Sequence, residues 1–562
     1  MIQKTLGRVL AEAAAAAAPE LGLDPAGIPD PEIERPRLRE HGDWSTNLAL
    51  VLAPKAKRPP RDVAEAIVRR LEPEGYVTRV EVAGPGFINL FLGSGWLVDL
   101  LREILRAGPE YGRTGTGRGE RIQVEFVSAN PTGPLHVGTA RNAALGDSLA
   151  NVLAAAGFEV EREYYFNDAG RQTELFEESV EARYLQRFGV DAELPEGGYQ
   201  GEYVIELAEA IAADHGDGLL SVDEQERRAL ILRETIERTM QGIRATLERF
   251  RIRFDTWASQ RELGESGAIG AAVDRLKRDG HAYEAEGAVW FRSTEFGDDK
   301  DRVLIRSNGE PTYFAADCAY MLQKASQGFT RFVYVWGADH HGDVKRMLGA
   351  AQALGVDPSR LWILLYQLVN LYRGGEPVRM SRRAGDFITL DELLDEVGPD
   401  AARYTLLTRS HDSPIDFDIE VVTRQTMDNP VYYVQYAHAR IASLVRFAEE
   451  RGVALQPWER VDFGRLVHEA ELDLLRKLEE LPEVVDLAAS VMAPHRLTRY
   501  AEEVAAAFHR FYTDCRVITE DEPLTQARLW LSVAAKQVIG SALGLLGVSA
   551  PESMERIADD GE

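Results

Sequence analysis

The sequence predicts a multidomain α/β protein with a doubly wound parallel sheet, followed by an all-helical region. Two strand–helix–strand patterns, at residues 122–166 and 331–371, predict the sheet. Between them lies a charged, mostly helical stretch of about residues 170–260, which we interpret as an insertion. Strand signals fade after about residue 390. With 562 residues and a prior of about 150 residues per domain, the chain has room for three or four domains.

The first pattern begins where apolar and polar residues alternate from Ile122 to Phe126, as in a strand. The Pro- and Gly-rich residues 130–134 end this strand. Residues 137–156 are rich in Ala and Leu, which favours a helix, and Gly157 ends it. Strand-like residues 158–166 follow. The unit is therefore a β-α-β crossover, which is expected to be right-handed.

The second pattern has strand-like residues 331–336, a helical stretch at 343–354 and strand-like residues 361–371. Doubly wound sheets bind ligands outside the carboxyl ends of their strands. The segments Ser128–Thr139 and Gly337–Gly342 lie at such ends, so we expect the binding site to be built from both.

The ends of the chain form separate units. A first unit closes with strand-like residues 87–92 and a Gly-rich linker, and the last helix carries apolar residues at helical spacing from Leu531 to Leu545. We expect four parts, at residues 1–115, 116–375 with the insertion at about 170–260, 376–428 and 429–562.

Composition excludes several classes of protein. The chain has 64 Lys and Arg against 91 Asp and Glu, a net charge of −27, which disfavours indiscriminate binding to DNA or anionic membranes. Two cysteines, Cys318 and Cys515, exclude a disulfide scaffold and a Cys-rich zinc site, and fit a reducing cytoplasm. The sequence contains no run of 18 apolar residues, so we expect no membrane-spanning helix. Asp339-His340-His341 has no further Cys or His spaced to complete a metal site, so we expect no protein-bound metal.

Two short motifs suggest phosphate chemistry. His136 and Gly138 lie where a strand gives way to a helix, a place that favours an anion and its close approach to the backbone. A Pro-Gly turn with an exposed His is the simpler interpretation. The segment Arg379-Met380-Ser381-Arg382-Arg383 follows the last predicted strand, and its arginines could clamp a polyphosphate. On charge alone, a solvated basic loop is the favoured interpretation of this segment.

Together the two motifs resemble those of class I aminoacyl-tRNA synthetases, whose forms are His-Ile-Gly-His and Lys-Met-Ser-Lys-Ser. Longer segments resemble the arginyl-tRNA synthetase family, and matches run from about residue 42 to 551. They are Gly42-Asp43 with Asn47, and residues 84–89, 124–138, 336–342, 429–440, 508–512 and 515–517.

The resemblance implies an N-terminal added α/β domain, a Rossmann-type catalytic domain with a helical insertion, and a helical anticodon-binding domain. It implies a cytoplasmic, monomeric arginine–tRNA ligase that activates L-arginine with ATP and Mg²⁺ and esterifies tRNA(Arg). Two alternatives remain open. One is a tRNA-binding paralogue with impaired catalysis; the other is a class I synthetase for another amino acid, such as cysteine, whose enzyme usually needs zinc-ligand cysteines.

The resemblance also implies residue roles. ATP contacts and catalysis fall on His136, Gly138, Thr139, Arg379, Met380, Ser381 and Arg382. The first-motif region comprises Ala129, Asn130, Pro131, Thr132, Gly133, Pro134, Leu135, His136, Val137, Gly138 and Thr139. Arginine would contact Glu125, Asn130, Tyr313, Asp317 and His340, with Asp317 paired to the guanidinium and Tyr313 fixing its plane. From the residues alone, the less favoured alternatives are a strand-surface carboxylate for Glu125 and a core residue for Tyr313.

Basic and aromatic residues are candidates for tRNA contact. Lys55, Lys57, Arg58 and Arg61 cluster in the first unit, where a solvated face is the alternative, and the family's added domain meets the tRNA elbow. The helical domain, entered through Asp400-Ala401-Ala402-Arg403, would read the anticodon. Tyr432, Tyr433 and Tyr436 are candidate stacking residues, although their helical spacing predicts that at least one is core.

Three departures from the family pattern affect four positions. Thr139 replaces the second His of the first motif, and Arg379 and Arg382 replace both lysines of the second, which changes a point charge into a fork. Gln260 stands where the family usually has Glu. Gln can accept a hydrogen bond from a guanidinium but cannot neutralise it, and Glu262 is a nearby substitute carboxylate.

Overall fold

The structure is a computed structural model that describes residues 2–36, 38–71, 75–378 and 388–554. The chain forms two compact units. One contains residues 1–108, 447–479 and 507–534, and the other contains residues 109–446, 480–506 and 535–562. Among the described helices, none is both long and apolar enough to cross a membrane.

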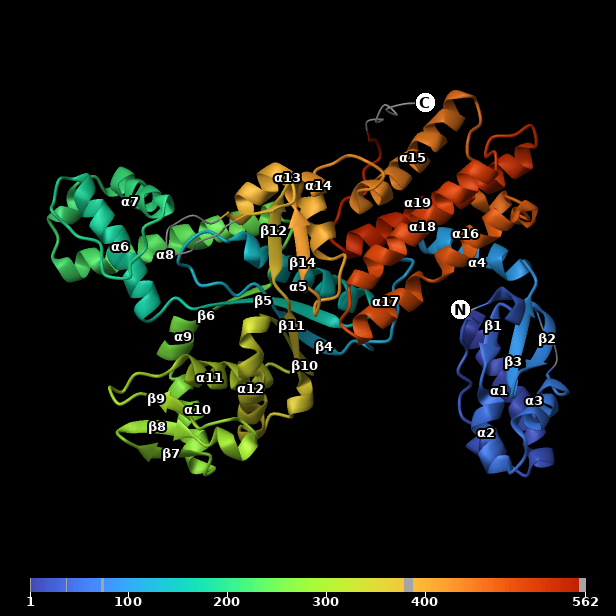
Figure 1. Cartoon of the computed structure of the whole chain (residues 1–562), viewed down its shortest axis with the longest axis horizontal. Helices are drawn as coiled ribbons and strands as arrows, with labels where there is room; N and C mark the ends of the chain where they lie inside the picture. The colour runs from blue at the N-terminus through green and yellow to red at the C-terminus, as the bar shows by residue number, and fades with distance from the viewer. Residues whose placement is uncertain (1, 37, 72–74, 379–387, 555–562) are drawn as a thin grey trace. The chain divides into compact units, whose positions relative to one another are not determined.

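The first unit opens with a small α/β arrangement (Figure 1). Its sheet has the order β1-β3-β2 with antiparallel pairs, and its core is built on Trp44, Leu48, Ile67 and Ile88. The predicted strand at 87–92 is confirmed as β3. The elements are α1 (Ile2–Leu21), β1 (Trp44–Thr46), α2 (Leu48–Ala56), α3 (Pro60–Val68), β2 (Val77–Ala83), β3 (Phe87–Leu92), α4 (Gly95–Ala107) and α16 (Glu469–Glu479).

The second unit is built on the predicted parallel sheet, whose order is β11-β10-β4-β5-β6. Chain order reverses at β4, which lies between β10 and β5, so the sheet is doubly wound. The close packing of α5 on β4 requires Gly146, where a Cβ atom would lie 2.3 Å from Phe126. The elements are β4 (Arg121–Glu125), α5 (Val137–Ala155), β5 (Glu159–Phe166), β6 (Thr256–Ser259), β10 (Arg331–Gly337), α12 (His341–Ala353) and β11 (Leu361–Tyr366).

The predicted strand at 361–371 is wrong in one respect, because it is two strands in different sheets. After β11, the Gln367 N–H donates to the His411 carbonyl, and the chain enters β12 (Val369–Arg373). β12 pairs with β13 (Glu376–Pro377) and in parallel with β14 (Ile415–Asp418), a strand beyond residue 390 that the sequence did not indicate. Strand-like residues lie on both sides of Gln367, so a single polar residue did not mark the break.

The predicted insertion forms three helices, α6 (Arg171–Arg187), α7 (Glu202–His215) and α8 (Glu224–Arg249). They enclose a small core of their own that includes Phe176, Tyr184 and Ile211. α6 and α7 form a lobe around one end of α8, and α8 leads back towards the sheet (Figure 1).

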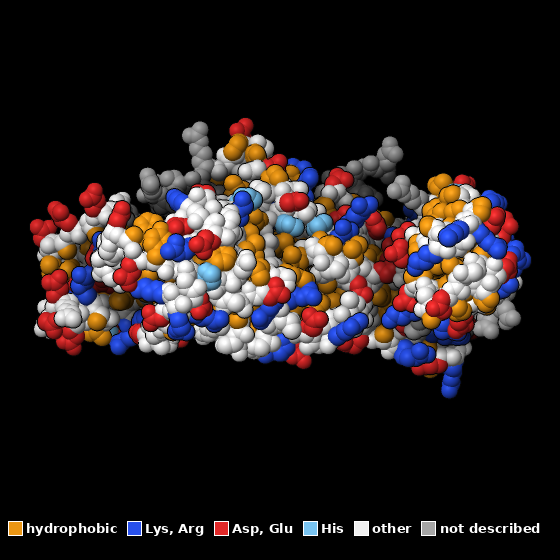
Figure 2. Space-filling model, turned by 90° about the horizontal axis from the view of Figure 1, so that it is seen from below, with side chains coloured by type: hydrophobic (Ala, Val, Ile, Leu, Met, Phe, Trp, Pro, Cys, Tyr) orange, Lys and Arg blue, Asp and Glu red, His pale blue; other side chains and the backbone are white. Residues whose placement is uncertain are grey.

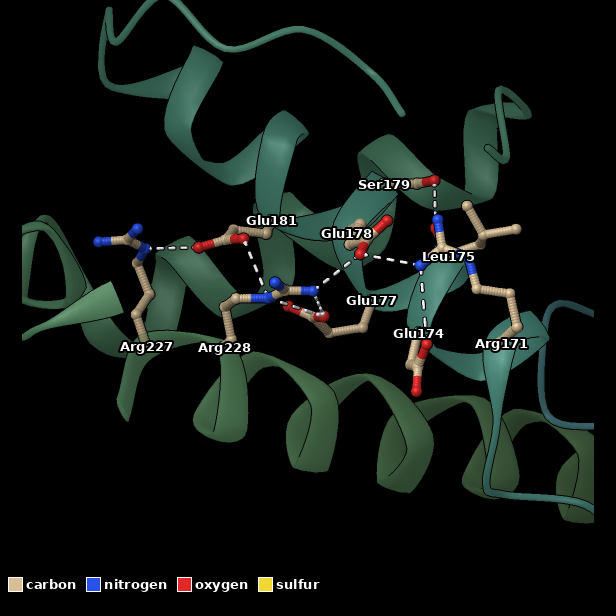
Figure 3. A network of polar contacts seen from close by, with 9 residues as sticks. All are labelled: Arg171, Glu174, Leu175, Glu177, Glu178, Ser179, Glu181, Arg227 and Arg228. Carbon is tan, nitrogen blue, oxygen red and sulfur yellow. Dashed lines mark hydrogen bonds and ion pairs between the residues drawn. The ribbon is translucent and has the colours of Figure 1, made fainter. Parts of the chain in front are cut away.

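An ion-pair network joins α6 to α8 (Figure 3). Arg228 on α8 lies among three carboxylates of α6, 3.1 Å from Glu177 and 2.9 Å from Glu178, while Arg227 pairs with Glu181 at 2.7 Å. Glu177 is buried, and burial raises its pKa to about 7 against the lowering influence of Arg228.

A further subdomain follows β6, and its helix α11 carries the candidate residues Tyr313 and Asp317. Its sheet has the order β7-β8-β9, and the buried side chains of α10 and α11 pack with those of β8, β9 and β10. The elements are α9 (Gln260–Glu265), α10 (Ala268–Arg278), β7 (Ala282–Ala285), β8 (Ala288–Phe291), β9 (Arg302–Ile305) and α11 (Tyr313–Ser326).

The region after β14 is helical, as predicted. Its elements, with the preceding α13, are α13 (Leu390–Leu406), α14 (Ile419–Val422), α15 (Pro430–Glu450), α17 (Leu481–Ser490), α18 (His495–Asp514) and α19 (Glu522–Leu545). Helices α15, α18 and α19 contain residues of both compact units.

Arg403 of α13 ties three elements together. The side chain is 0% exposed, donates to the carbonyls of Leu546 (3.0 Å) and Phe250 (2.9 Å), and pairs with Asp147 of α5. Arg403 thereby connects the segment that follows α19 and the segment that follows α8 to α5, the helix that begins at the first motif.

Replacing Arg403 with Met is expected to lower the free energy of unfolding by about 3–5 kcal/mol, because it removes the closer of the two cations of buried Asp147 and leaves only Arg162, at 3.6 Å. Urea denaturation followed by circular dichroism measures the change. The matched control is Arg251→Met, which breaks a pair with Asp400 in which Arg251 is largely solvated, and which is expected to cost about 1 kcal/mol or less. Equal effects of the two variants would contradict this account.

Candidate functional site

The carboxyl edge of the parallel sheet gathers the predicted segments. The first-motif loop follows β4, Gly337 ends β10, and both strands are central in the sheet. Val127 and Ser128 adopt positive φ angles of 65° and 43°, which is unfavourable for a β-branched residue such as Val. The Val127 N–H donates to Asn142 Oδ1 at 2.6 Å, and the Asn142 amide donates to the Val335 carbonyl at 2.8 Å. Asn142 therefore holds the ends of β4 and β10 together and stabilises this bend.

The first-motif loop is fixed at several points along its length. Tyr164 donates to the Ala129 carbonyl at 2.8 Å, and Tyr203 of α7 donates to the Thr132 carbonyl at 3.3 Å. Gly133 has a φ of 147°, and a Cβ atom there would lie 3.0 Å from the Tyr203 ring. The insertion thus packs directly on this loop and excludes a larger residue at position 133.

His136 occupies the N-cap position of α5 in extended backbone, with φ −96° and ψ 160°. A Cβ atom at Gly138 would lie 2.8 Å from His136 Cε1, so only glycine lets the imidazole lie over the first helical turn. Thr139, in the same turn, is buried. The arrangement places an imidazole at a helix start, where the positive end of the helix dipole favours an anion.

The first motif pairs with the chain just beyond the second motif. Val137 N–H donates to the Ile388 carbonyl at 3.0 Å, and Leu390 N–H donates to the Leu135 carbonyl at 2.7 Å. The second-motif candidates Arg379, Met380, Ser381 and Arg382 lie outside the described residues. The pairing places Ile388 and Leu390, which follow that segment in the chain, beside the start of α5.

Helix α11 directs one row of side chains along the site. Tyr313, Asp317, Tyr320 and Lys324 follow the spacing 4, 3, 4 and therefore share a helix face. Tyr313 is 51% exposed, so the alternative interpretation of it as a core residue is wrong. Lys324, at the other end of the row, is buried. The row runs from solvent to the interior.

Glu125 ends β4 and is only 7% exposed, so its alternative interpretation as a strand-surface carboxylate is also wrong. Its carboxylate accepts hydrogen bonds from Lys324 and, at 3.3 Å, from Ser128 Oγ. Burial raises the pKa of Glu125, and Glu163 adds to the rise, whereas Lys324 opposes it.

Asp317 faces the same region. Burial raises its pKa to about 7, the negative charge of Glu125 contributes, and Arg346 of α12 opposes the rise. Because the charge of Glu125 helps to raise the pKa of Asp317, the two carboxyl groups lie close enough to form one anionic site.

Gln260 begins α9 beside the end of β6 and accepts a hydrogen bond from Tyr165 at 3.1 Å. Tyr165 in turn stacks on Tyr320, with ring centroids 4.4 Å apart. Glu262 is exposed, and two residues along a helix turn a side chain by about 200°, so the expectation that it substitutes for the missing carboxylate at 260 is wrong.

The remaining arginine-site candidates contact neighbouring elements. Asn130 donates to Gln172 of α6 at 2.8 Å. His340, in the turn after β10, lies 2.9 Å from Asp343 and is half exposed. Among the described residues, no group of three His, Cys, Asp or Glu side chains is arranged to hold a metal ion.

The predicted tRNA contacts differ in exposure. Lys55, Lys57, Arg58 and Arg61 are exposed on and between α2 and α3; Arg58 also donates to the Glu20 carbonyl, and Arg61 to that of Gly84. On the face drawn in Figure 2, basic side chains are interspersed with acidic ones.

The aromatic candidates lie on α15. Tyr432 is 5% exposed and stacks on Tyr436 at 5.9 Å between ring centroids, whereas Tyr436 is half-buried. The expectation that at least one tyrosine is core is confirmed. Because a base needs an open ring face, the structure favours Tyr436 over Tyr432 for direct stacking.

Sequence reasoning missed Lys324, Glu163 and Tyr165. The helical spacing from Asp317 to Lys324 was available as a signal. Glu163 could have been found from the alternation of β5, which places it on one face with Glu161.

Comparison with known proteins identifies the family. Three family models match in order: the arginyl-tRNA synthetase N-terminal domain at residues 2–92, the class I (R) tRNA synthetase catalytic domain at 101–441, and the DALR anticodon-binding domain at 434–554.

Full-length relatives agree. An arginine–tRNA ligase of Carboxydothermus hydrogenoformans is 51% identical over 93% of this chain and 94% of the relative. That of Moorella thermoacetica is 49% identical over 98% and 99%. The Thermus thermophilus arginyl-tRNA synthetase structure shares the fold, with a TM-score of 0.75, 24% identity, and coverage of 99% of this chain and 100% of that one. The chain belongs to the arginyl-tRNA synthetase family.

Proposed function

We propose that the protein is an arginine–tRNA ligase that activates L-arginine with ATP and transfers it to the 3′ end of tRNA(Arg). The observation that carries this proposal is the pair of carboxylates, Glu125 and Asp317, at the carboxyl edge of the sheet. A buried anionic site of this kind suits a cationic side chain, and the adjacent helix start at His136 suits a phosphate.

In the activation step, the arginine carboxylate attacks the α-phosphorus of ATP and pyrophosphate leaves. Such catalysis consists mostly of positioning and charge stabilisation. His136 donates to the phosphate oxygens on which charge develops, Gly138 lets the nucleotide approach the backbone, and the Thr139 hydroxyl adds a donor in the position of the family's second His. Arg379, Met380, Ser381 and Arg382 close over the phosphates. Mg²⁺ enters with ATP, held chiefly by phosphate oxygens and water.

In the arginine pocket, Asp317 pairs with the guanidinium and Tyr313 fixes its plane. Glu125 adds the second negative charge. Asn130 and His340 meet the amino and carboxylate ends of the substrate, and the Gln260–Tyr165 pair supplies neutral acceptors where the family usually has a carboxylate. A guanidinium with five N–H donors requires several acceptors in this geometry.

The alternative functions are not favoured. A class I synthetase for cysteine usually depends on a zinc site, but Cys318 and Cys515 are both buried and no metal-binding group occurs among the described residues. A non-catalytic paralogue would have no need of the buried Glu125 and the half-buried Asp317.

We assign tRNA contact to Lys55, Lys57, Arg58 and Arg61 in the N-terminal part and to Tyr436 of α15, with Tyr432 packed behind it. We further propose that the domains span residues 1–115, 116–375, 376–428 and 429–562. The protein is proposed to be a monomer located in the cytoplasm.

Arginine-dependent exchange of labelled pyrophosphate into ATP tests the proposed activity. We expect exchange with arginine and not with lysine or citrulline, measured with and without tRNA(Arg). Absence of exchange and of charging under both conditions would refute the proposed function.

Arginine recognition is expected to depend on pH. Because burial raises the pKa of Asp317 to about 7, this acid is ionised above pH 7 and becomes neutral below it. Protonation removes the partner of the guanidinium, so the KM for arginine is expected to rise about tenfold between pH 8 and pH 6. Steady-state charging at several pH values measures this, with the KM for ATP as the internal control. A flat arginine KM would contradict the assignment of Asp317.

A further inference from the structure

Beneath the arginine pocket lies a buried cation that the residue roles assigned above leave unused. Lys324 is 1% exposed, and its ammonium donates to Glu125 and lies 2.8 Å from Glu163 Oε1. The rings of Tyr320 and Tyr334 lie 4.4 and 4.6 Å from the same nitrogen. Lys324 therefore occupies a site built from two carboxylates and two aromatic faces.

The two carboxylates are neighbours across the sheet. Glu125 on β4 and Glu163 on β5 are register partners, so their side chains emerge on the same face. Gln123 donates to the other oxygen of Glu163 at 2.8 Å, and Ser128 donates to the other oxygen of Glu125 at 3.3 Å. Without a cation between them, two buried carboxylates this close would share a proton.

The charge of this cluster is simple to count. Two carboxylates and one ammonium leave one net negative charge, and Asp317 adds another on the same face of α11. Arg346 of α12, itself paired with Asp343, is the nearby cation that influences Asp317. An arginine side chain entering beside Asp317 therefore meets an excess of negative charge.

We propose that Lys324 and Glu163 are positioning residues of the arginine pocket. Lys324 holds the Glu125 carboxylate in place and favours its ionised form. Glu163 adds a further negative charge, so that the cluster of Glu125, Glu163 and Lys324 keeps one net negative charge. The cluster thus sets the charge that selects a cationic substrate side chain. This inference deepens the proposed function and rests on it.

The titration behaviour supports this geometry. Burial disfavours the charged form of Lys324, yet Glu125 and Glu163 outweigh burial and raise its pKa, so the ammonium stays charged. Burial raises the pKa of Glu125, and Lys324 opposes this rise.

The decisive variant is Glu163→Gln, which keeps the shape of the side chain and removes one negative charge. We expect the KM for arginine to rise about tenfold, with kcat and the KM for ATP changed less than twofold, since only attraction of the cation is weakened. The matched control is Glu177→Gln in the insertion, which removes a buried glutamate paired with Arg228 (Figure 3) and is expected to leave the KM for arginine unchanged.

Lys324→Met provides a second readout. In the Lys324→Met variant, Glu125 and Glu163 would share a proton, so the KM for arginine is expected to rise more steeply below neutral pH than in the native enzyme. The Lys324→Arg variant keeps the positive charge and is expected to show the native pH profile. If Lys324→Met does not fold, Glu163→Gln alone decides. An arginine KM within twofold of native in Glu163→Gln would overturn the inference, while absence of charging by the native protein would instead overturn the proposed function.

Discussion

Asp317→Asn is expected to lower kcat/KM for arginine by about 10²- to 10³-fold, equivalent to about 3–4 kcal/mol of lost interaction. The change is nearly isosteric and leaves the guanidinium of the substrate without its direct anionic partner. We expect most of the loss in the KM for arginine, while the KM for ATP remains native. Steady-state charging of tRNA(Arg) with varied arginine and varied ATP measures both.

The control for this variant is Asp298→Asn. Asp298 is also a nearly buried aspartate in an ion pair, 2.8 Å from Arg302, but it lies in the segment between β8 and β9. We expect native arginine kinetics from it. If Asp317→Asn retains a native arginine KM, the carboxylate does not bind the guanidinium and the pocket must be reassigned.

His136→Ala is expected to lower kcat by about 10²- to 10³-fold, because it removes a donor aimed at charge that develops on the phosphate. The KM for arginine should change little, since the imidazole lies at the start of α5 and not among the carboxylates. Single-turnover formation of the adenylate, followed by quenched flow, isolates this step. His215→Ala on α7 is the control and is expected to be native; unchanged adenylate formation in His136→Ala would remove His136 from the catalytic assignment.

The sequence predicts the sheet well because its signals are local. The alternation of Ile122–Phe126, the Ala-rich helix after Val137 and the turn at Gly157 each mark an element directly, and chain reversal at β4 follows from the two crossovers. Once the sheet is known, the meeting of the first-motif loop and Gly337 at one edge follows from the shared direction of parallel strands.

The remaining features depend on long-range contacts. The β11–β12 break is hard to predict because strand-like residues lie on both sides of Gln367, and β14 becomes a strand only by pairing with β12. Lys324 contacts Glu125 across 199 residues, and neither residue alone indicates a buried ion pair. Likewise, Tyr432 and Tyr436 look equivalent in the sequence, and only the packing of α15 makes one of them core.

The central claim is that the protein selects arginine. It is tested most directly by charging tRNA with each of the twenty labelled amino acids under identical conditions. We expect acid-precipitable label with arginine alone, at a level set by the amount of tRNA(Arg). Charging by another amino acid, or by none while tRNA still binds, would contradict the account.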